Sequence, residues 1–351
     1  MCFHANEESF LQVGGVQKGV LGYFHPTRRD LNVFYERLDP SLSEDVMFHE
    51  ANHYLQQLVD EKFWVPHFPG ESLAEYYGAS SWDPVKKKLT VGLIQEGRLC
   101  EIQSDIDSGD PMDLVKLVST EGAYAHYTWG WSLVHFLMND PRYAAKFHHF
   151  FLSLPDVKKV ERVSVNGTMW TISQADVMTV FARELGLKDA DAVRKLDAEW
   201  HDYIEEKLKL VTASGKERAG FKANQDGRKI KATRLLKEAI AMGSRNPLAF
   251  HTLAEMKAED GQLKDAAELW KQALAIDPLN GLFYSRWAFY SARLDKKEAE
   301  RMQALALELG ADDFWVFLEL GEKKPEPGKK PGGDEPGGGD KPGGKDPPDG
   351  G

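Results

Sequence analysis

Two histidines and a glutamate lie close together early in the chain, in the segment FHEANH at residues 48–53. Side chains four positions apart on a helix lie on one face, so His49 and His53 can offer two ring nitrogens to one metal ion. Glu50 is rotated about a third of a turn from His49, where it can take a proton from water without being a ligand. A catalytic zinc site has three protein ligands and one water, so the pattern requires a third ligand elsewhere.

The residues that follow His53 decide between the common continuations of this motif. A metzincin needs a glycine three positions later and a histidine three beyond that, but this chain has Gln56 and Val59 there. A gluzincin instead needs a glutamate on a second helix downstream. Glu71 lies 18 positions after His53, at the start of ESLAEYYG, and the Pro- and Gly-containing loop before it can turn that helix back. Glu75, one helical turn further, could accept a hydrogen bond from a ligating histidine.

FHEANH followed by PGESLAEYYG resembles the gluzincin branch of the zinc metallopeptidases. It is most similar to an uncharacterised bacterial family whose second motif reads like EGLAEYF, and the resemblance covers roughly residues 15–210. The resemblance implies a thermolysin-like zincin domain that hydrolyses peptide bonds. The roles that it implies are zinc ligation by His49, His53 and Glu71, general base and acid catalysis by Glu50, and support of a ligating histidine by Glu75.

A tyrosine further along the chain matches another gluzincin feature. In the aminopeptidases of this branch, a Tyr-x-x-Gly at the start of a later helix supplies a phenol that stabilises the oxyanion. Here YTWG places Tyr127 and Gly130 in that pattern, 56 residues after Glu71. Three features depart from the family: Ser72 replaces a usual glycine, only about 45 residues precede the first motif, and no GxMEN-like segment is present. The segment GVLGYF could still be the edge strand that pairs with a substrate backbone.

Simpler interpretations of these residues stay open. His49 and His53 could be partly buried helix residues that bond to Asp60 or to a carbonyl. Glu71 could be favoured at a helix N-terminus by the helix dipole alone, and Glu75 could be an exposed helix residue.

Other aromatic residues and histidines also have more than one possible role. Tyr127 could be core packing in an aromatic-rich helix, with Tyr124 as its nearest competitor for the site. His148 and His149 are adjacent and therefore point apart on a helix, so we interpret them as packing or surface residues. His67 lies in the loop between the two motifs and could border the site.

The pattern of the first 211 residues predicts an α+β, predominantly helical domain with a small N-terminal β-sheet. Residues 10–37 contain alternating stretches that predict short strands or a hairpin. A helix is expected from about Leu42, a second over 71–78 and a third over 122–138. VSVNGTMWTIS predicts a small hairpin around Asn166-Gly167, followed by two helices.

The rest of the chain predicts helical repeats and a disordered end. Residues 212–228 are polar and Gly-containing, which favours a linker. LLKEAIA at 235–241 matches LWKQALA at 269–275 with an offset of 34, and residues 229–321 resemble the tetratricopeptide repeat family. The Gly/Pro-rich residues 322–351 cannot bury a core and are expected to be disordered.

Composition limits the partners and the compartment. The formal charge of −11 argues against a nucleic-acid or anionic-membrane partner. The two cysteines cannot form a disulfide framework or a metal-binding pair motif. The sequence as it stands shows no membrane span or signal peptide, which predicts a cytoplasmic protein, or an exported one if the N-terminus is truncated.

Two functions follow as hypotheses. The first is a Zn²⁺-dependent peptidase in which Glu50 activates water, acting on a peptide or protein substrate. The second is an inactive zinc-binding scaffold whose helical repeats bind a protein partner. A combination, in which the repeats deliver a protein substrate to the metal site, also stays open.

Overall fold

The computed structural model describes residues 1–311, apart from positions 15, 27, 35–39, 158 and 165–166. The described chain is predominantly helical, as predicted, and it contains three small β-sheets. Its contacts separate it into two compact units, Met1–Ser244 and a second that begins at Arg245. No helix among the described residues is long and apolar enough to cross a membrane. The predicted tail, and residues 312–321 of the predicted repeat region, lie outside the described residues.

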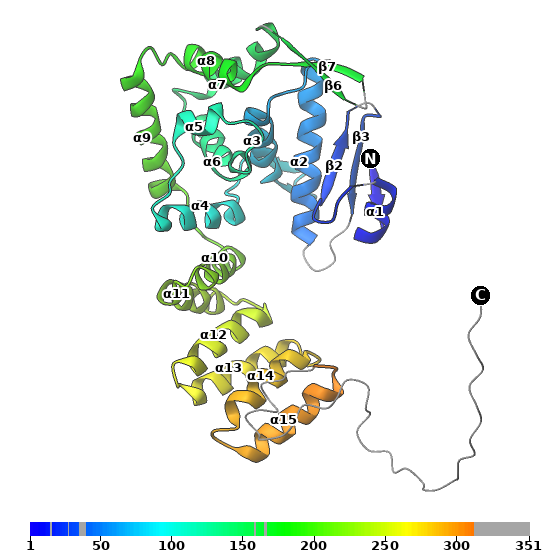
Figure 1. Cartoon of the computed structure of the whole chain (residues 1–351), viewed down its shortest axis with the longest axis vertical. Coiled ribbons are helices and arrows are strands. Elements are labelled where there is room, and N and C mark those ends of the chain that lie inside the picture. Colours follow the sequence, from blue (N-terminus) through cyan, green and yellow to red (C-terminus); the bar gives the residue numbers. More distant parts are fainter. Residues whose placement is uncertain (15, 27, 35–39, 158, 165–166, 312–351) are drawn as a thin grey trace, which may run out of the picture. The chain divides into compact units, whose positions relative to one another are not determined.

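A small mixed sheet opens the first unit (Figure 1). Its strands and the helix between the first two are β1 (Cys2–His4), α1 (Glu7–Gly14), β2 (Gly22–His25) and β3 (Asp30–Phe34). The strand order is β1-β3-β2, with β1 parallel and β2 antiparallel to β3. The hairpin predicted within residues 10–37 is therefore present, and β2, which contains part of GVLGYF, lies at an edge of the sheet as described.

Helix α1 occupies a segment for which the Gly/Val-rich sequence predicts a strand. The backbone N–H of Ser9 donates to Asn6 Oδ1 at 2.9 Å, and the backbone N–H of Asn6 donates to Ser9 Oγ at 3.4 Å. These reciprocal bonds satisfy the free donors of a helix start. Phe10 is fully buried behind them. The strand prediction for this segment is wrong because the local cap begins a helix that buries an aromatic ring.

The two sequence motifs lie on helices that pack against each other, α2 (Pro40–Val59) and α3 (His67–Gly78). Two glycines allow close approach to α2. A Cβ on Gly22 of β2 would lie 2.5 Å from Val46 Cγ1, and a Cβ on Gly78 would lie 3.2 Å from the carbonyl oxygen of Asp45. The edge strand and the second motif therefore both pack directly on the helix that carries the first motif.

The remaining helices of this unit form its core. They are α4 (Glu96–Ser108), α5 (Leu114–Ser119), α6 (Ala125–Asn139), α7 (Ala144–Ser153), α8 (Gln174–Leu185) and α9 (Ala190–Lys207), with a short 3₁₀ turn at Leu154–Asp156. Helix α6 is buried along most of its length, and Trp131, Leu133 and Leu137 have no exposed surface. It packs against α3, α4, α7 and α9, so it links the motif helices to the rest of the core.

The contact between α3 and α6 accommodates Ser72. Ser72 Oγ donates a hydrogen bond to the carbonyl oxygen of His126 at 2.9 Å. A Cβ on Gly130 would collide with the Ser72 side chain. The glycine of YTWG therefore makes room for the serine, whose hydroxyl is satisfied although it is fully buried.

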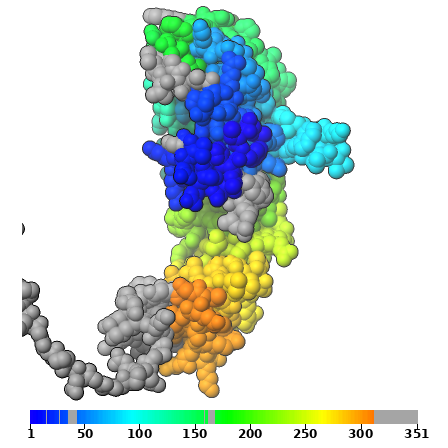
Figure 2. Space-filling view, turned by 90° about the vertical axis from the view of Figure 1, so that its right-hand side faces the viewer, coloured from blue at the N-terminus to red at the C-terminus, as the bar shows by residue number. Residues whose placement is uncertain are grey.

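Two separate hairpins complete the first unit, β4 (Ser81–Asp83) with β5 (Lys88–Thr90) and β6 (Val160–Ser164) with β7 (Gly167–Thr171). The second is the hairpin predicted around Asn166-Gly167, although residues 165–166 themselves lie outside the described residues. The first projects from the unit in the space-filling view (Figure 2), and Val85 at its tip is 90% exposed.

The predicted linker at 212–228 instead contains a helix, α10 (Ala213–Gln225), which packs against α11 (Lys229–Ala241). Thr212 caps it by accepting a hydrogen bond from the backbone N–H of Gly215 at 2.9 Å. Gly220 lies against Leu236, and Ala219 and Ala223 are buried. The small residues that favour a linker in the sequence are here the contact surface of a helix pair.

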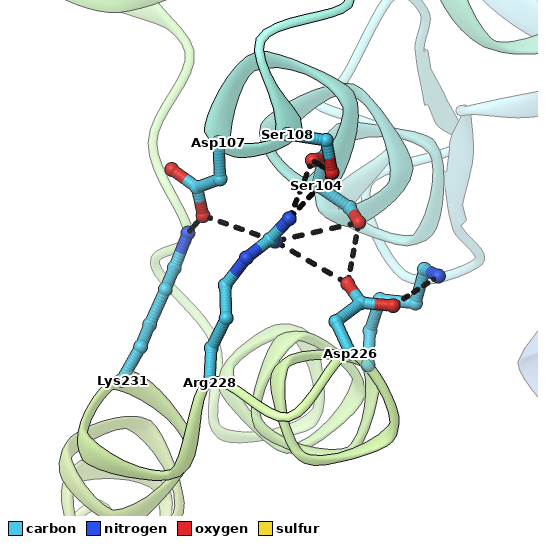
Figure 3. A network of polar contacts seen from close by, with 7 residues as sticks. Ser104, Asp107, Ser108, Asp226, Arg228 and Lys231 are labelled. Carbon is cyan, nitrogen blue, oxygen red and sulfur yellow. Dashed lines mark hydrogen bonds and ion pairs between the residues drawn. The ribbon is translucent and has the colours of Figure 1, made fainter.

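Polar contacts hold this helix pair to α4 (Figure 3). Asp226 accepts a hydrogen bond from Ser104 Oγ at 2.5 Å, and Arg228 donates to Ser108 Oγ at 2.6 Å. Asp107 pairs with both Arg228 and Lys231. The pair α10–α11 is therefore part of the first unit.

The second unit contains two further helix pairs, α12 (Pro247–Glu259) with α13 (Leu263–Ile276) and α14 (Gly281–Ser291) with α15 (Lys296–Glu308). Ala254, Ala266 and Ala273 are buried, as expected of small residues that let paired helices approach. The first helices of the three pairs begin 34 residues apart, at Ala213, Pro247 and Gly281. The predicted period is thus present, and it starts one helix earlier than the sequence analysis placed it.

Candidate metal centre

Helix α2 presents its motif toward α3 because its polar side chains are tied to that helix. Gln56, one of the residues that excludes a metzincin, donates to Asn52 Oδ1 at 2.6 Å and to the carbonyl oxygen of Gly70 at 2.9 Å. Gln56 and Asn52 are buried. These bonds hold the start of α3 against α2, one position before Glu71.

Three candidate ligand atoms meet between the two helices. His49 Nε2 and His53 Nε2 are 3.2 Å apart, and Glu71 Oε2 lies 3.3 Å from the first and 3.2 Å from the second. Among the described residues, these three form the group of ligand atoms that lie close enough together to hold a metal ion. The structure thus brings together the three residues that the sequence assigns as ligands, across two helices.

The size of this triangle fits a small tetrahedral ion. Two atoms bound at about 2.0–2.1 Å to a tetrahedral zinc lie about 3.3–3.4 Å from each other. The three measured edges match that separation. Two imidazole nitrogens and one carboxylate oxygen are also a ligand set that catalytic zinc sites use.

Glu75 lies behind the ring of His49. Its Oε1 is 3.5 Å from His49 Nδ1, on the opposite side of the ring from the metal-facing nitrogen. Arg98 of α4 binds the same carboxylate through two hydrogen bonds, of 2.7 Å to Oε1 and 3.0 Å to Oε2. Glu75 is buried, so the interpretation as an exposed helix residue is wrong. Paired with Arg98, Glu75 can hold the His49 ring with Nε2 directed at the metal position.

The electrostatics of the site favour a cation. Burial alone would lower the pKa of His49, but contacts with Glu71, Glu50 and Glu75 raise that pKa above its ordinary value. Burial alone would raise the pKa of Glu71, yet hydrogen bonds from His49 and His53 hold it well below its usual range. Three carboxylates against the single guanidinium of Arg98 leave an excess of negative charge that a divalent ion would neutralise.

Tyr127, rather than Tyr124, faces the candidate site. The Tyr127 ring stacks on His49, with centroids 6.1 Å apart and planes 10° apart. Burial and the neighbouring carboxylates raise its pKa. Tyr124 is 62% exposed and accepts a hydrogen bond from Arg98 at 2.9 Å. Tyr127 is therefore a protonated phenol at the metal position, and Tyr124 lies outside it.

A cavity of about 710 Å³ connects these groups to the surface. Its wall includes the three ligands, Glu50 and Tyr127, together with Gly22, Tyr23 and Phe24 of the edge strand β2. Met169 and Thr171 of β7 contribute another part of the wall. A pocket of this size can enclose several side chains of a polymer or one small ligand. Glu50 is largely buried but lines the cavity, so its carboxylate can reach a bound molecule.

Arg98 and His126 are two residues near the site that the sequence does not indicate. Arg98 lies 23 residues beyond Glu75 and belongs to no motif. His67 borders the cavity, and its ring contacts that of His126. His148 and His149 are both exposed, and His149 pairs with Glu184 at 2.7 Å, so they are surface residues as interpreted.

A scan against protein-family models and a search of curated proteins found no match to this chain.

Proposed function

We propose that the protein is a zinc-dependent peptidase of the gluzincin type, with zinc held by His49, His53 and Glu71. One observation carries the proposal: three ligand atoms with edges of 3.2–3.3 Å share a cavity with Glu50 and Tyr127. A purely structural role for the two histidines would not require a carboxylate and a phenol at the same opening. The combination matches a hydrolytic site, in which ligands, a base and an oxyanion donor must converge.

The chain's own groups divide the work of hydrolysis. When bound, zinc supplies Lewis acidity toward a peptide carbonyl and makes water more acidic. Glu50 accepts a proton from the attacking water and delivers it to the leaving nitrogen. Tyr127 donates a hydrogen bond to the oxygen on which negative charge develops, and its raised pKa keeps the phenol protonated. Glu75 and Arg98 keep the His49 ring in place.

The edge strand supports a peptide as the substrate. Among the described residues, β2 pairs with β3 on one side and with no strand on the other, and Gly22, Tyr23 and Phe24 line the cavity. An extended peptide can add to such an edge through main-chain hydrogen bonds, while the cavity receives alternate side chains. This arrangement would lay a scissile bond across the mouth of the metal site.

The test combines metal content with cleavage of a mixed peptide library. We expect the wild type to bind one zinc and to cleave peptides in a chelator-sensitive manner. Glu50→Gln should keep zinc and lose about 10²–10⁴-fold in turnover, because general acid–base catalysis contributes about that much. Glu44→Gln, the same change at an exposed position of α2, is the matched control and should behave like the wild type. Unaltered turnover in Glu50→Gln would sink the mechanism.

A second candidate function is an inactive scaffold that binds a protein partner. The three helix pairs with starts 34 residues apart favour it, since repeated helix pairs of this length provide binding surfaces in other proteins. Stoichiometric zinc without cleavage of any library peptide would support this candidate over the peptidase.

A further inference from the structure

Two histidines outside the ligand triangle meet at the wall of the same cavity. His67 Nδ1 lies 2.6 Å from His126 Nδ1, and His126 Nε2 lies 2.8 Å from the carbonyl oxygen of Leu117. His126 is fully buried on α6, whereas His67, at the start of α3, is half-buried and lines the cavity. Neither belongs to the group of described residues whose ligand atoms lie close enough to share a metal ion.

The hydrogen bonds of this pair determine where its protons are. A carbonyl oxygen can only accept, so His126 Nε2 carries a hydrogen. Burial lowers the pKa of His126 to about 4, so the ring is neutral at pH 7 and its Nδ1 has a lone pair. Two nitrogens 2.6 Å apart must share one hydrogen, so His67 donates from Nδ1. The neutral His67 ring is then left with a lone pair on Nε2, the nitrogen that His126 does not engage.

Two glutamines of the cavity wall have their amide donors engaged elsewhere. Gln174 donates to the carbonyl oxygens of Phe68 and Val118, at 3.2 Å and 2.7 Å. Gln56 is tied to α2 and α3 in the same way. Their amide groups are part of the scaffold, so His67 Nε2 differs from them in having its polar atom left for a bound molecule.

We propose that His67 contacts the substrate and accepts a hydrogen bond from one of its amide N–H groups through Nε2. His126 is the positioning residue that keeps His67 in the tautomer with an acceptor on that atom. The inference rests on the proposed peptidase function and deepens it. The N–H groups of an extended chain point alternately to its two sides, so those of a substrate paired with β2 that point away from β2 need an acceptor. His67 would supply it, and the site would then select amide-bearing polymers.

The tautomer can be observed in the wild-type protein without any turnover. Histidine-labelled protein examined by ¹H–¹⁵N NMR should show His67 protonated at Nδ1 and His126 protonated at Nε2. Selective assignment requires His67→Gln and His126→Phe spectra, each of which removes one pair of signals. A neutral His67 protonated at Nε2 would overturn the inference and leave the proposed peptidase function intact.

The substrate contact is tested with a cleaved library peptide whose amides are N-methylated one at a time. In the wild type, N-methylation of one amide other than the scissile amide should lower kcat/KM by about tenfold, which is roughly the contribution of one hydrogen bond. His67→Leu should lower kcat/KM of the parent peptide by a similar factor and lose the sensitivity at that position. His67→Gln, which restores an acceptor near the place of Nε2, should recover part of it.

The remaining outcomes separate this inference from the proposed function. If N-methylation lowers kcat/KM of His67→Leu as much as that of the wild type at every position of the peptide, the proposed contact is overturned. Loss of zinc in that variant would also overturn it, because it would make His67 a ligand. If the wild type cleaves no peptide, the proposed function fails and the substrate contact falls with it, whatever tautomer NMR shows.

Discussion

Two pairs of histidines lie at or just behind the wall of one cavity, which His49, His53 and His67 line and His126 does not, and their surroundings differ in charge. His49 and His53 face Glu71, with Glu50 and Glu75 close by, and the pKa of His49 is raised. His67 and His126 are bonded to each other and to a main-chain carbonyl, and burial lowers the pKa of both. The same side chain is thus prepared for two tasks. Carboxylates around the first pair favour a cation, whereas a neutral, buried partner favours a fixed hydrogen-bond acceptor in the second.

The two pairs also differ in how the chain assembles them. The first comes from one turn of a single helix, completed by a second helix whose first contact is fixed by Gln56. The second joins residues 59 positions apart, and it depends on the packing of α3 against α6.

The largest expected effect is the difference in zinc affinity between two variants, each of which replaces one histidine of one pair. His53→Ala removes an edge of the ligand triangle, and we expect its zinc affinity to fall by more than the about 10–100-fold typical for changes to outer partners. His67→Leu should keep stoichiometric zinc, because it lies outside the triangle. Elemental analysis and competition with a chromogenic chelator measure both. Equal zinc loss in the two variants would erase the distinction between the pairs.

A smaller effect is expected from the support of the first pair. Glu75→Gln weakens the acceptor behind His49 Nδ1, so zinc affinity should fall by about tenfold, the lower end for such partners. The matched control is Glu101→Gln, because Glu101 also contacts Arg98, at 3.8 Å, without contacting a histidine ligand. The chelator competition should show the control within about twofold of the wild type. A zinc affinity that is unchanged in Glu75→Gln would remove Glu75 from the site.

Much of the candidate metal site is predictable from the sequence because its parts are local. The spacing of His49 and His53 requires only a helix, and Glu71 requires only that a second helix folds back. YTWG adds Tyr127 by resemblance, and the stacking of its ring on His49 supports that choice over Tyr124. Each of these predictions depends on one helical spacing or one short motif, and both can be read from the sequence alone.

Contacts between residues that are far apart in the sequence could not be predicted. Arg98 and His126 have no spacing relation to the residues that they bond, so only tertiary packing reveals them. The helix at α1 was missed because a cap of two polar residues outweighed an alternating pattern. The helix at α10 was missed because Gly220 signals a loop in the sequence but fits against Leu236 in the fold.

The smallest expected effect is a pH dependence that has opposite signs for the two pairs. The folded pKa of His126 is about 4 against an ordinary value of 6.5, so between these values the unfolded chain binds a proton that the folded chain does not. Its contribution therefore lowers the free energy of unfolding as the pH falls, by at most about 1.4 kcal/mol per pH unit. In the metal-free protein, the raised pKa of His49 contributes stability that is present in acid and lost as the pH rises through it.

Urea unfolding of the zinc-loaded protein between pH 6.5 and about pH 5 can separate the His126 contribution. His135 and His251 also have pKa values lowered to about 4 by burial, so the wild type should lose stability through several groups. In His126→Phe the loss over this window should be smaller by about 1–2 kcal/mol. The comparison uses the slope with pH, so a uniform destabilisation by the substitution does not affect it. An equal slope in both proteins would mean that His126 binds its proton equally well in the folded and the unfolded chain, which would contradict the lowered pKa of the buried ring.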